Sequence, residues 1–374
     1  MLAIYTIQPT PKCSDGFITK QNLAGIPSSF LKLANKTELM EYMVDIRRTL
    51  HQNSELGYEE LETSKLIRTE LDKIGIDYRY PVAVTGVVGF MGTGKPPFVA
   101  IRADMDALAM QVPGKMHACG HDAHVSMLLG AAKMLQQHRT IVLVFQPAEE
   151  GGGGAKKMLD EGILKNVDAI FGLHVSVRFP IGTVATRPGP LLAASGFFEA
   201  VISGKGGHAA TPHHAIDPVV AASNVIISLP SLVVTVAGFE GGGASNIIPI
   251  SAGVHRCNAS VDFNESEKPS YPPMVNHEHL HEHFQRVASD MLGATNIVEA
   301  RPLMGAEDFS FFAEAIPGYF FSVWMQNENQ EKLVSGHSPY FTVNEEVLPY
   351  GAALVTRYLL EHQIETDTSF HDEF

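Results

Sequence analysis

One stretch of the sequence decides the fold, Ile141-Val-Leu-Val-Phe-Gln-Pro-Ala-Glu-Glu-Gly-Gly-Gly-Gly154. Its opening residues, up to Phe145, are all apolar, which is the pattern of a strand buried on both faces of a sheet. The glycines lead into a predicted helix at 155–161, and a second buried strand is predicted at 169–175. Because strands alternate here with helices, we expect a mostly parallel sheet in an α/β domain.

The pattern continues on both sides of this stretch. Apolar residues at helical spacing predict helices at 39–50 and 61–74. At 374 residues the chain is longer than one core usually allows, so we expect two domains. A smaller unit begins near Ser195, and a Pro-rich stretch at 268–273 marks its far boundary. Its expected elements are a strand at 197–203, a helix at 217–229, and strands at 233–239 and 254–263.

Composition excludes several classes of partner. The formal net charge is −14 and no Lys/Arg run offsets it, which disfavours nucleic acid because such binding depends on phosphate neutralisation. No apolar stretch approaches the ~20 residues that a membrane helix needs. The chain has three cysteines, a small and odd number that does not fit a disulfide framework.

The residues that suggest chemistry lie where predicted strands and turns end. Cys119 and His121 are two residues apart, and Gly120 between them allows a tight bend. Glu149 and Glu150 follow one buried strand, and His174 ends the next, where sites of open α/β sheets form. One of two adjacent carboxylates can bind a metal while the other handles protons. A last histidine, His337, lies in a Gly-His-Ser-Pro turn.

Each of these features has a structural explanation when taken alone. A lone histidine at a strand end is more often structural than a ligand, and a Glu-Glu pair usually begins a solvated helix. Their combination on successive strand ends favours a metal site, and its N, S and O donors favour Zn²⁺ or Mn²⁺ over Mg²⁺ or Ca²⁺. A competing H-E-x-x-H pattern runs from His277 to His281, but Asn276 would cap that helix and leave the pattern at its frayed start.

The motifs together resemble the M20 peptidase family, and more narrowly its aminoacylase/hippurate hydrolase branch. The segments that carry the resemblance are 117–124, 146–154, 172–175, 204–212, 305–309 and 336–339. Two further segments, 112–116 and 254–284, resemble plant indole-3-acetic acid (auxin)–amino acid conjugate hydrolases.

The resemblance implies a hydrolase with two divalent metal ions, Mn²⁺ or Zn²⁺. Cys119 would bridge the ions, and the remaining ligands would be His121, Glu150, His174 and His337. Glu149 would be the general base, and Asp106 would orient a ligand. His208 would stabilise the oxyanion, in related enzymes across a dimer. Asn246 would hold the substrate near its carboxylate, and Glu307 would line the substrate side of the site.

The resemblance also implies the domain layout. A catalytic domain with a mixed, mostly parallel sheet flanked by helices would comprise 1–192 and 265–374, and 193–264 would form an inserted α+β lid/dimerisation domain. This lid is predicted to be truncated, because 250–253 bridge an interval in which relatives carry a third strand with a Gly-Thr-x-Arg motif and a second helix. The shortening would remove a carboxylate-clamping arginine and leave backbone donors unpaired.

The predicted function is hydrolysis of the amide bond of N-acyl amino acids, namely indole-3-acetic acid–amino acid conjugates, by a homodimer formed through the lid. A general aminoacylase or dipeptidase, and a catalytically impaired metal-binding or dimer partner, are the alternatives. The ending His371-Asp-Glu-Phe374 differs by one residue from the HDEL retrieval signal. With the resemblance it predicts the endoplasmic reticulum lumen, and otherwise the cytoplasm.

Overall fold

The computed structural model describes residues 27–92, 98–110, 114–135, 141–229, 234–236, 238–242, 244–249, 251, 258–263, 268–327 and 333–369. Both ends of the chain, including the His371–Phe374 signal, therefore lie outside the described residues. In the described part of the chain, no helix combines the length and apolar character that a membrane crossing requires.

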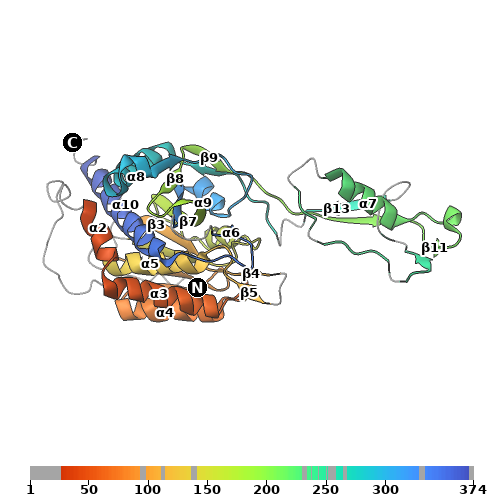
Figure 1. Ribbon diagram of the computed structural model, residues 1–374, viewed down its shortest axis with the longest axis horizontal. Coiled ribbons are helices and arrows are strands. Elements are labelled where there is room, and N and C mark those ends of the chain that lie inside the picture. Colours follow the sequence, from red (N-terminus) through yellow and green to blue (C-terminus); the bar gives the residue numbers. More distant parts are fainter. Residues whose placement is uncertain are drawn as a thin grey trace, which may run out of the picture.

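An eight-stranded mixed sheet forms the body of the protein (Figure 1), in the order β1-β2-β6-β3-β7-β16-β8-β15. Its centre is parallel: β6, β3, β7 and β16 run in one direction. The strands are β1 (Asp77–Val82), β2 (Gly86–Met91), β3 (Val99–Asp104), β6 (Ile141–Gln146), β7 (Ala169–Pro180), β8 (Val184–Thr186), β15 (Ile297–Glu299) and β16 (Gly318–Gln326). The predicted fold class and the buried strands β6 and β7 are thus confirmed.

Helices cover both faces of the sheet. Successive side chains of a strand point to opposite faces, so the continuous apolar strands present apolar side chains on both. In β6, Leu143 and Phe145 belong to one apolar cluster while Val142 and Val144 belong to another. The first cluster packs under α3 (Thr37–Gln52), α4 (Leu61–Ile74), α5 (His121–Met134), α8 (Glu278–Leu292) and α10 (Leu348–Ser369). The second packs under α6 (Gly154–Asp160) and α9 (Phe309–Ala315). The continuous apolar runs are therefore explained by burial on both faces.

A smaller group of elements extends away from this body (Figure 1). Strand β10 (Glu199–Ser203) pairs antiparallel with β13 (Asn258–Asp262). Helix α7 (Pro218–Ser228) is capped by Asp217, whose side chain accepts the Val219 N–H. A short pair, β11 (Gly207–His208) with β12 (Ile247–Ile248), lies farther out. The other α-helix and β-strands of the described residues are α2 (Pro27–Ala34), β4 (Leu108–Ala109), β5 (Lys115–Met116), β9 (Gly189–Leu192) and β14 (Met274–Asn276).

The strand predicted at 233–239 is not formed in the described part of that segment, so this prediction was wrong. Val236 and Phe239 there are 43% and 48% exposed. Among the described residues, the sheet that would pair with such a strand consists of β10 and β13, and a strand without a partner leaves its backbone groups unpaired. The described sheet also leaves Val201 and Val261 about half exposed.

The buried side chain of Arg102 joins the carboxyl ends of the central strands. From β3, its Nε donates to Oε1 of Gln146 at 2.7 Å, and Nη1 donates to Oδ2 of Asp104 at 2.8 Å. Its Nη2 donates to Glu307 at 2.8 Å and to Asp308 at 3.1 Å, both just before α9. Asp104 also contacts α5, because its Oδ1 lies 2.6 Å from Nδ1 of His124 in that helix. One guanidinium thus holds two strands, one helix and one loop together.

We predict that Arg102→Met lowers the free energy of unfolding by about 3–5 kcal/mol, because it leaves buried carboxylates without their cation. Arg79→Met is the matched control: Arg79 pairs with Glu161 at 2.9 Å on the surface, where a pair is worth about 1 kcal/mol or less. Thermal and urea midpoints measure both changes. Equal losses in the two variants would contradict the structural role of Arg102.

Candidate metal centre

The Cys119–His121 segment is placed by a tight bend at the start of α5. Gly120, between the two side chains, has φ +91° and is the residue before the helix. A Cβ there would lie 2.4 Å from Cγ2 of Val175, so neither the backbone angle nor the space suits another residue. The glycine predicted to allow the bend is therefore required by it.

Backbone contacts fix the two carboxylates that follow β6. Ala148 has φ +51°, and its N–H donates to the buried Glu60 at 2.9 Å. The N–H of Glu150 donates to Oδ2 of Asp106 at 3.0 Å, and the carbonyl of Glu149 accepts the Tyr271 hydroxyl at 2.8 Å. Glu149 and Glu150 are consequently held by their own backbone.

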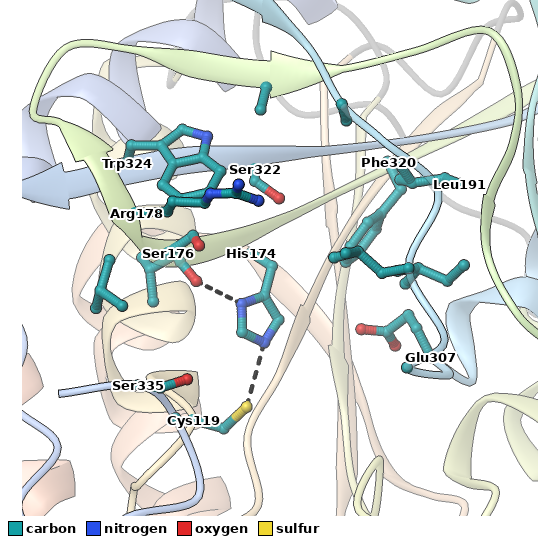
Figure 2. A pocket seen from close by; sticks show the side chains of 18 of the residues that line it. Cys119, His174, Ser176, Arg178, Leu191, Glu307, Phe320, Ser322, Trp324 and Ser335 are labelled. Carbon is teal, nitrogen blue, oxygen red and sulfur yellow. Dashed lines mark hydrogen bonds between the residues drawn. The ribbon is translucent and has the colours of Figure 1, made fainter. Parts of the chain in front are cut away.

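The other two histidines approach the same point from β7 and from a late loop. Nε2 of His174 lies 3.3 Å from the Cys119 sulfur (Figure 2). His337 has φ +62°, its N–H donates to the carbonyl of Ala118, and its Nε2 lies 3.2 Å from Oε1 of Glu150. Asp106 lies behind this group, with Oδ1 3.3 Å from Nδ1 of His121. The structure therefore brings together all five predicted metal ligands.

The donor atoms suit a cation. Overlapping sets have ligand atoms within 4.8 Å of one another: Cys119, His121 and His174; Cys119, Glu150 and His337; His121, Glu149 and Glu150. Nε2 of His121 and Oε1 of Glu150 are buried and accept or donate no hydrogen bond among the described residues; the 3.2 Å contact of Oε1 with His337 lacks hydrogen-bond geometry. Buried polar atoms are rarely left in this state. A cation between them would satisfy both.

The ligands influence one another's protonation. Burial opposes ionisation of the Cys119 thiol, yet the adjacent His174 and the other histidines hold its pKa well below the ordinary value. Burial opposes protonation of His174, but the Cys119 sulfur raises the pKa of this imidazole to about 9. The neighbouring Cys119 sulfur and Glu150 carboxylate raise the pKa of His337 to about 10. Without metal, the thiolate is therefore neutralised by imidazolium protons.

A cavity of about 620 Å³ opens beside the cluster. Glu149 lines it and is nearly buried, and burial together with Glu307 and Glu150 raises the pKa of its carboxyl well above the ordinary value. Glu307 lines the cavity too, and a carboxylate oxygen of each lies within 4.8 Å of the other and of Asp308. The structure thus places Glu149 and Glu307 at the cavity, as the sequence predicted.

His208 and Asn246 lie elsewhere in this chain. They line a second cavity in the projecting part of the molecule, and the Ala209 N–H donates to the carbonyl of Asn246. Neither residue lines the cavity at the metal ligands. The structure brings the two near each other, but not to the cluster within one chain.

The H-E-x-x-H pattern has a structural role. His277 precedes α8, and His281 is buried with Nδ1 3.0 Å from the Tyr319 hydroxyl. Among the described residues, no group of potential metal ligands includes either histidine. Rejecting this pattern as the metal site therefore agrees with the structure.

Sequence reasoning missed the residues beneath the site, Arg102, Asp104, His124 and Asp308. Nε2 of His124 accepts the Val175 N–H at 2.9 Å, so this histidine ties α5 to β7 next to His174. His124 lies inside the 117–124 segment, and the sequence signal for Asp104 is its acidic side chain two positions before Asp106.

We predict that metal uptake at pH 7 releases about three protons, because the raised pKa values of His121, His174 and His337 favour their protonated forms and a ligand must present a free lone pair. Since all three pKa values are raised, apparent affinity should increase as the pH rises from 7 towards 9. Calorimetric titration with Zn²⁺ or Mn²⁺ in two buffers of different ionisation enthalpy measures the release. A binding enthalpy that is the same in both buffers would contradict it.

Comparison with known proteins agrees with this geometry. Residues 100–361 match the family model of peptidase family M20/M25/M40. IAA-amino acid hydrolase ILR1-like 4 from Arabidopsis thaliana is 54% identical, over 98% of this chain and 96% of its own length. That alignment extends over 426 positions, whereas the chain has 374 residues, so the relative has residues without a counterpart here. Thermostable carboxypeptidase 2 from Saccharolobus solfataricus is 36% identical, over 86% of this chain and 95% of its own length.

A solved structure shows the same fold. The Bacillus subtilis YXEP protein, described as a dinuclear metal binding peptidase from the M20 family, is 30% identical with a TM-score of 0.70, and the match covers 88% of this chain and 99% of that one. These matches confirm the predicted family, fold class and amide-hydrolysing activity, and the chain belongs to peptidase family M20/M25/M40.

Proposed function

We propose that this chain hydrolyses the amide bond of N-acyl amino acids, with indole-3-acetic acid–amino acid conjugates as substrates, and releases the free acid and the amino acid. The observation that carries the proposal is the cluster of Cys119, His121, Glu150, His174 and His337, with Glu149 beside it at the cavity. The aryl-acetyl substrate class is supported by three Arabidopsis relatives, named IAA-amino acid hydrolases, that are 51–54% identical.

Two divalent ions, Mn²⁺ or Zn²⁺, are proposed as the cofactors. Cys119 would contribute to holding both ions, because its sulfur lies in one ligand set with His121 and His174 and in another with Glu150 and His337. When bound, such ions lower the pKa of water and polarise the substrate carbonyl. Asp106 supports the ligands, because one oxygen faces Nδ1 of His121 and the other accepts the Glu150 N–H.

Glu149 is proposed as the general base. Its carboxyl lies in the cavity wall, and its raised pKa brings it closer to the neutral range in which a group both accepts and returns a proton. It accepts the proton of the attacking water at a carboxylate oxygen and later delivers it to the leaving amine nitrogen. Glu307 faces the same space, and its carboxylate accepts a hydrogen bond from Arg102.

The lid residues require a second chain in this proposal. A tetrahedral oxyanion needs a positioned donor, and His208 and Asn246 do not line the cavity of their own chain. We therefore retain the homodimer through the lid, in which His208 and Asn246 serve the other subunit's site. A chain that sediments as a monomer under turnover conditions contradicts it. We likewise propose the endoplasmic reticulum lumen as the location of the protein.

A general aminoacylase or peptidase is the second candidate, favoured by the 36% identity to a thermostable carboxypeptidase. The same site could serve both substrate classes. Indole-3-acetyl-alanine, hippurate and free dipeptides are the panel that separates them. Preference for the aryl-acetyl conjugate supports the first function, and cleavage of free dipeptides supports the second.

We predict that Glu149→Gln lowers kcat for indole-3-acetyl-alanine by at least about 10²-fold, since a general base typically contributes 10²–10⁴-fold. Metal content should stay the same, because a side-chain amide of equal size replaces the carboxylate. Glu38→Gln, on an exposed helix turn, is the control and should match the parent chain. Undiminished kcat in Glu149→Gln, or a parent chain without amidase activity when metal-loaded, would refute the proposal.

A further inference from the structure

The cavity beside the metal cluster has one face of the central sheet as a wall. His174, Ser176 and Arg178 alternate along β7, so their side chains point to one face. Phe320, Ser322 and Trp324 alternate in the same way along the neighbouring β16, and the register places Ser322 opposite His174 and Trp324 opposite Ser176. All six residues line the cavity. The wall therefore continues from the metal ligand His174 along both strands.

The two directions along this wall differ in chemistry (Figure 2). Phe320 and Leu191 lie on one side of His174, and Leu192 and Leu303 line the same cavity. Arg178 and Trp324 lie on the other side, and Ser322 is directly opposite His174 in the strand register. A substrate whose scissile amide is at the cluster must extend in both directions, so the wall distinguishes its two ends.

The charges in the cavity indicate which end of the substrate lies on which side of His174. Glu307 lies on the side of Phe320 and Leu191 in Figure 2, within reach of Asp308 and Glu149, so a free carboxylate there would meet like charge. Arg178 makes no ion pair or hydrogen bond with any described residue, and the indole N–H of Trp324 has no acceptor among them. The second cavity arginine, Arg301, is two residues from Glu299, which also lines the cavity, so that pair adds little net charge.

We propose that Arg178 is a specificity-determining residue that binds the free carboxylate of the substrate's amino acid, with the apolar acyl group on the Phe320–Leu191 side of the metal centre. The inference rests on the proposed function. The step from His174 to Arg178 spans about 13 Å of strand, which leaves room for an amino acid between the cluster and the guanidinium. A cation from the sheet face thereby supplies carboxylate recognition in a chain whose lid is shortened.

The test compares binding of indole-3-acetyl-alanine with that of its uncharged analogue, indole-3-acetyl-alaninamide. Calorimetry on the full-length, metal-loaded Glu149→Gln chain measures affinity without turnover. We expect that chain to prefer the acid by about tenfold or more, as a charge-assisted hydrogen bond gives. Adding Arg178→Met should abolish the preference by weakening the acid alone, and Arg178→Lys should restore much of it. In the chain with Glu149 intact, Arg178→Met should raise KM for the acid and leave kcat nearly unchanged.

Three results would overturn the assignment. They are an unchanged acid preference in Arg178→Met, loss of the preference in Arg301→Met instead, and no measurable binding of either compound. Arg178 is exposed, and its guanidinium carbon lies 5.8 Å from the centroid of the Phe179 ring, so unchanged amide binding is needed to verify the fold of each variant. Failure of the proposed function is seen separately, as absence of hydrolysis by the metal-loaded parent while the binding preference remains.

Discussion

The guanidinium of Arg102 is almost fully buried among three carboxylates and an amide, and the geometry of the site depends on that arrangement. A buried cation is tolerated only with partners, and buried carboxylates only with a cation. Because the partners come from β3, β6 and the loop before α9, the strand ends cannot shift independently. Asp104 carries the constraint to His124, and His124 carries it to the β7 backbone beside His174. Hydrogen bonds within the protein thus hold the strand ends that carry the ligands.

Much of this could be predicted because it depends on local pattern. The apolar run of β6 and the ligand types at strand ends specified an α/β sheet with a site at its carboxyl edge. Strand order could not be predicted in the same way. Strand β16 lies between β7 and β8, which precede it by more than a hundred residues, and periodicity does not record such pairings. The apolar stretch of β16 was a visible signal for a strand, but nothing local shows that its alternate residues form the cavity wall.

In the lid, local sequence pattern did not predict the structure. Local pattern at 233–239 favours a strand, but a strand forms only with a partner, and the described residues of this segment form none. Val201 on β10 and Val261 on β13 are about half exposed, so the described sheet leaves apolar side chains uncovered. The lid residues His208 and Asn246 were identified by motif alone, and their distance from the cluster follows from tertiary placement that a motif cannot encode. The metal ligands and the lid residues thus line different cavities of this chain.

The central claim is that Cys119, His121, Glu150, His174 and His337 together hold two metal ions. X-ray diffraction from crystals loaded with Mn²⁺ or Zn²⁺, recorded on both sides of the metal absorption edge, locates each ion through its anomalous signal. We predict two anomalous peaks separated by a few ångströms, with the Cys119 sulfur bonded to both and Glu149 bonded to neither. A single peak, a peak at His277 and His281, or Glu149 as a ligand in place of Glu150 would contradict it.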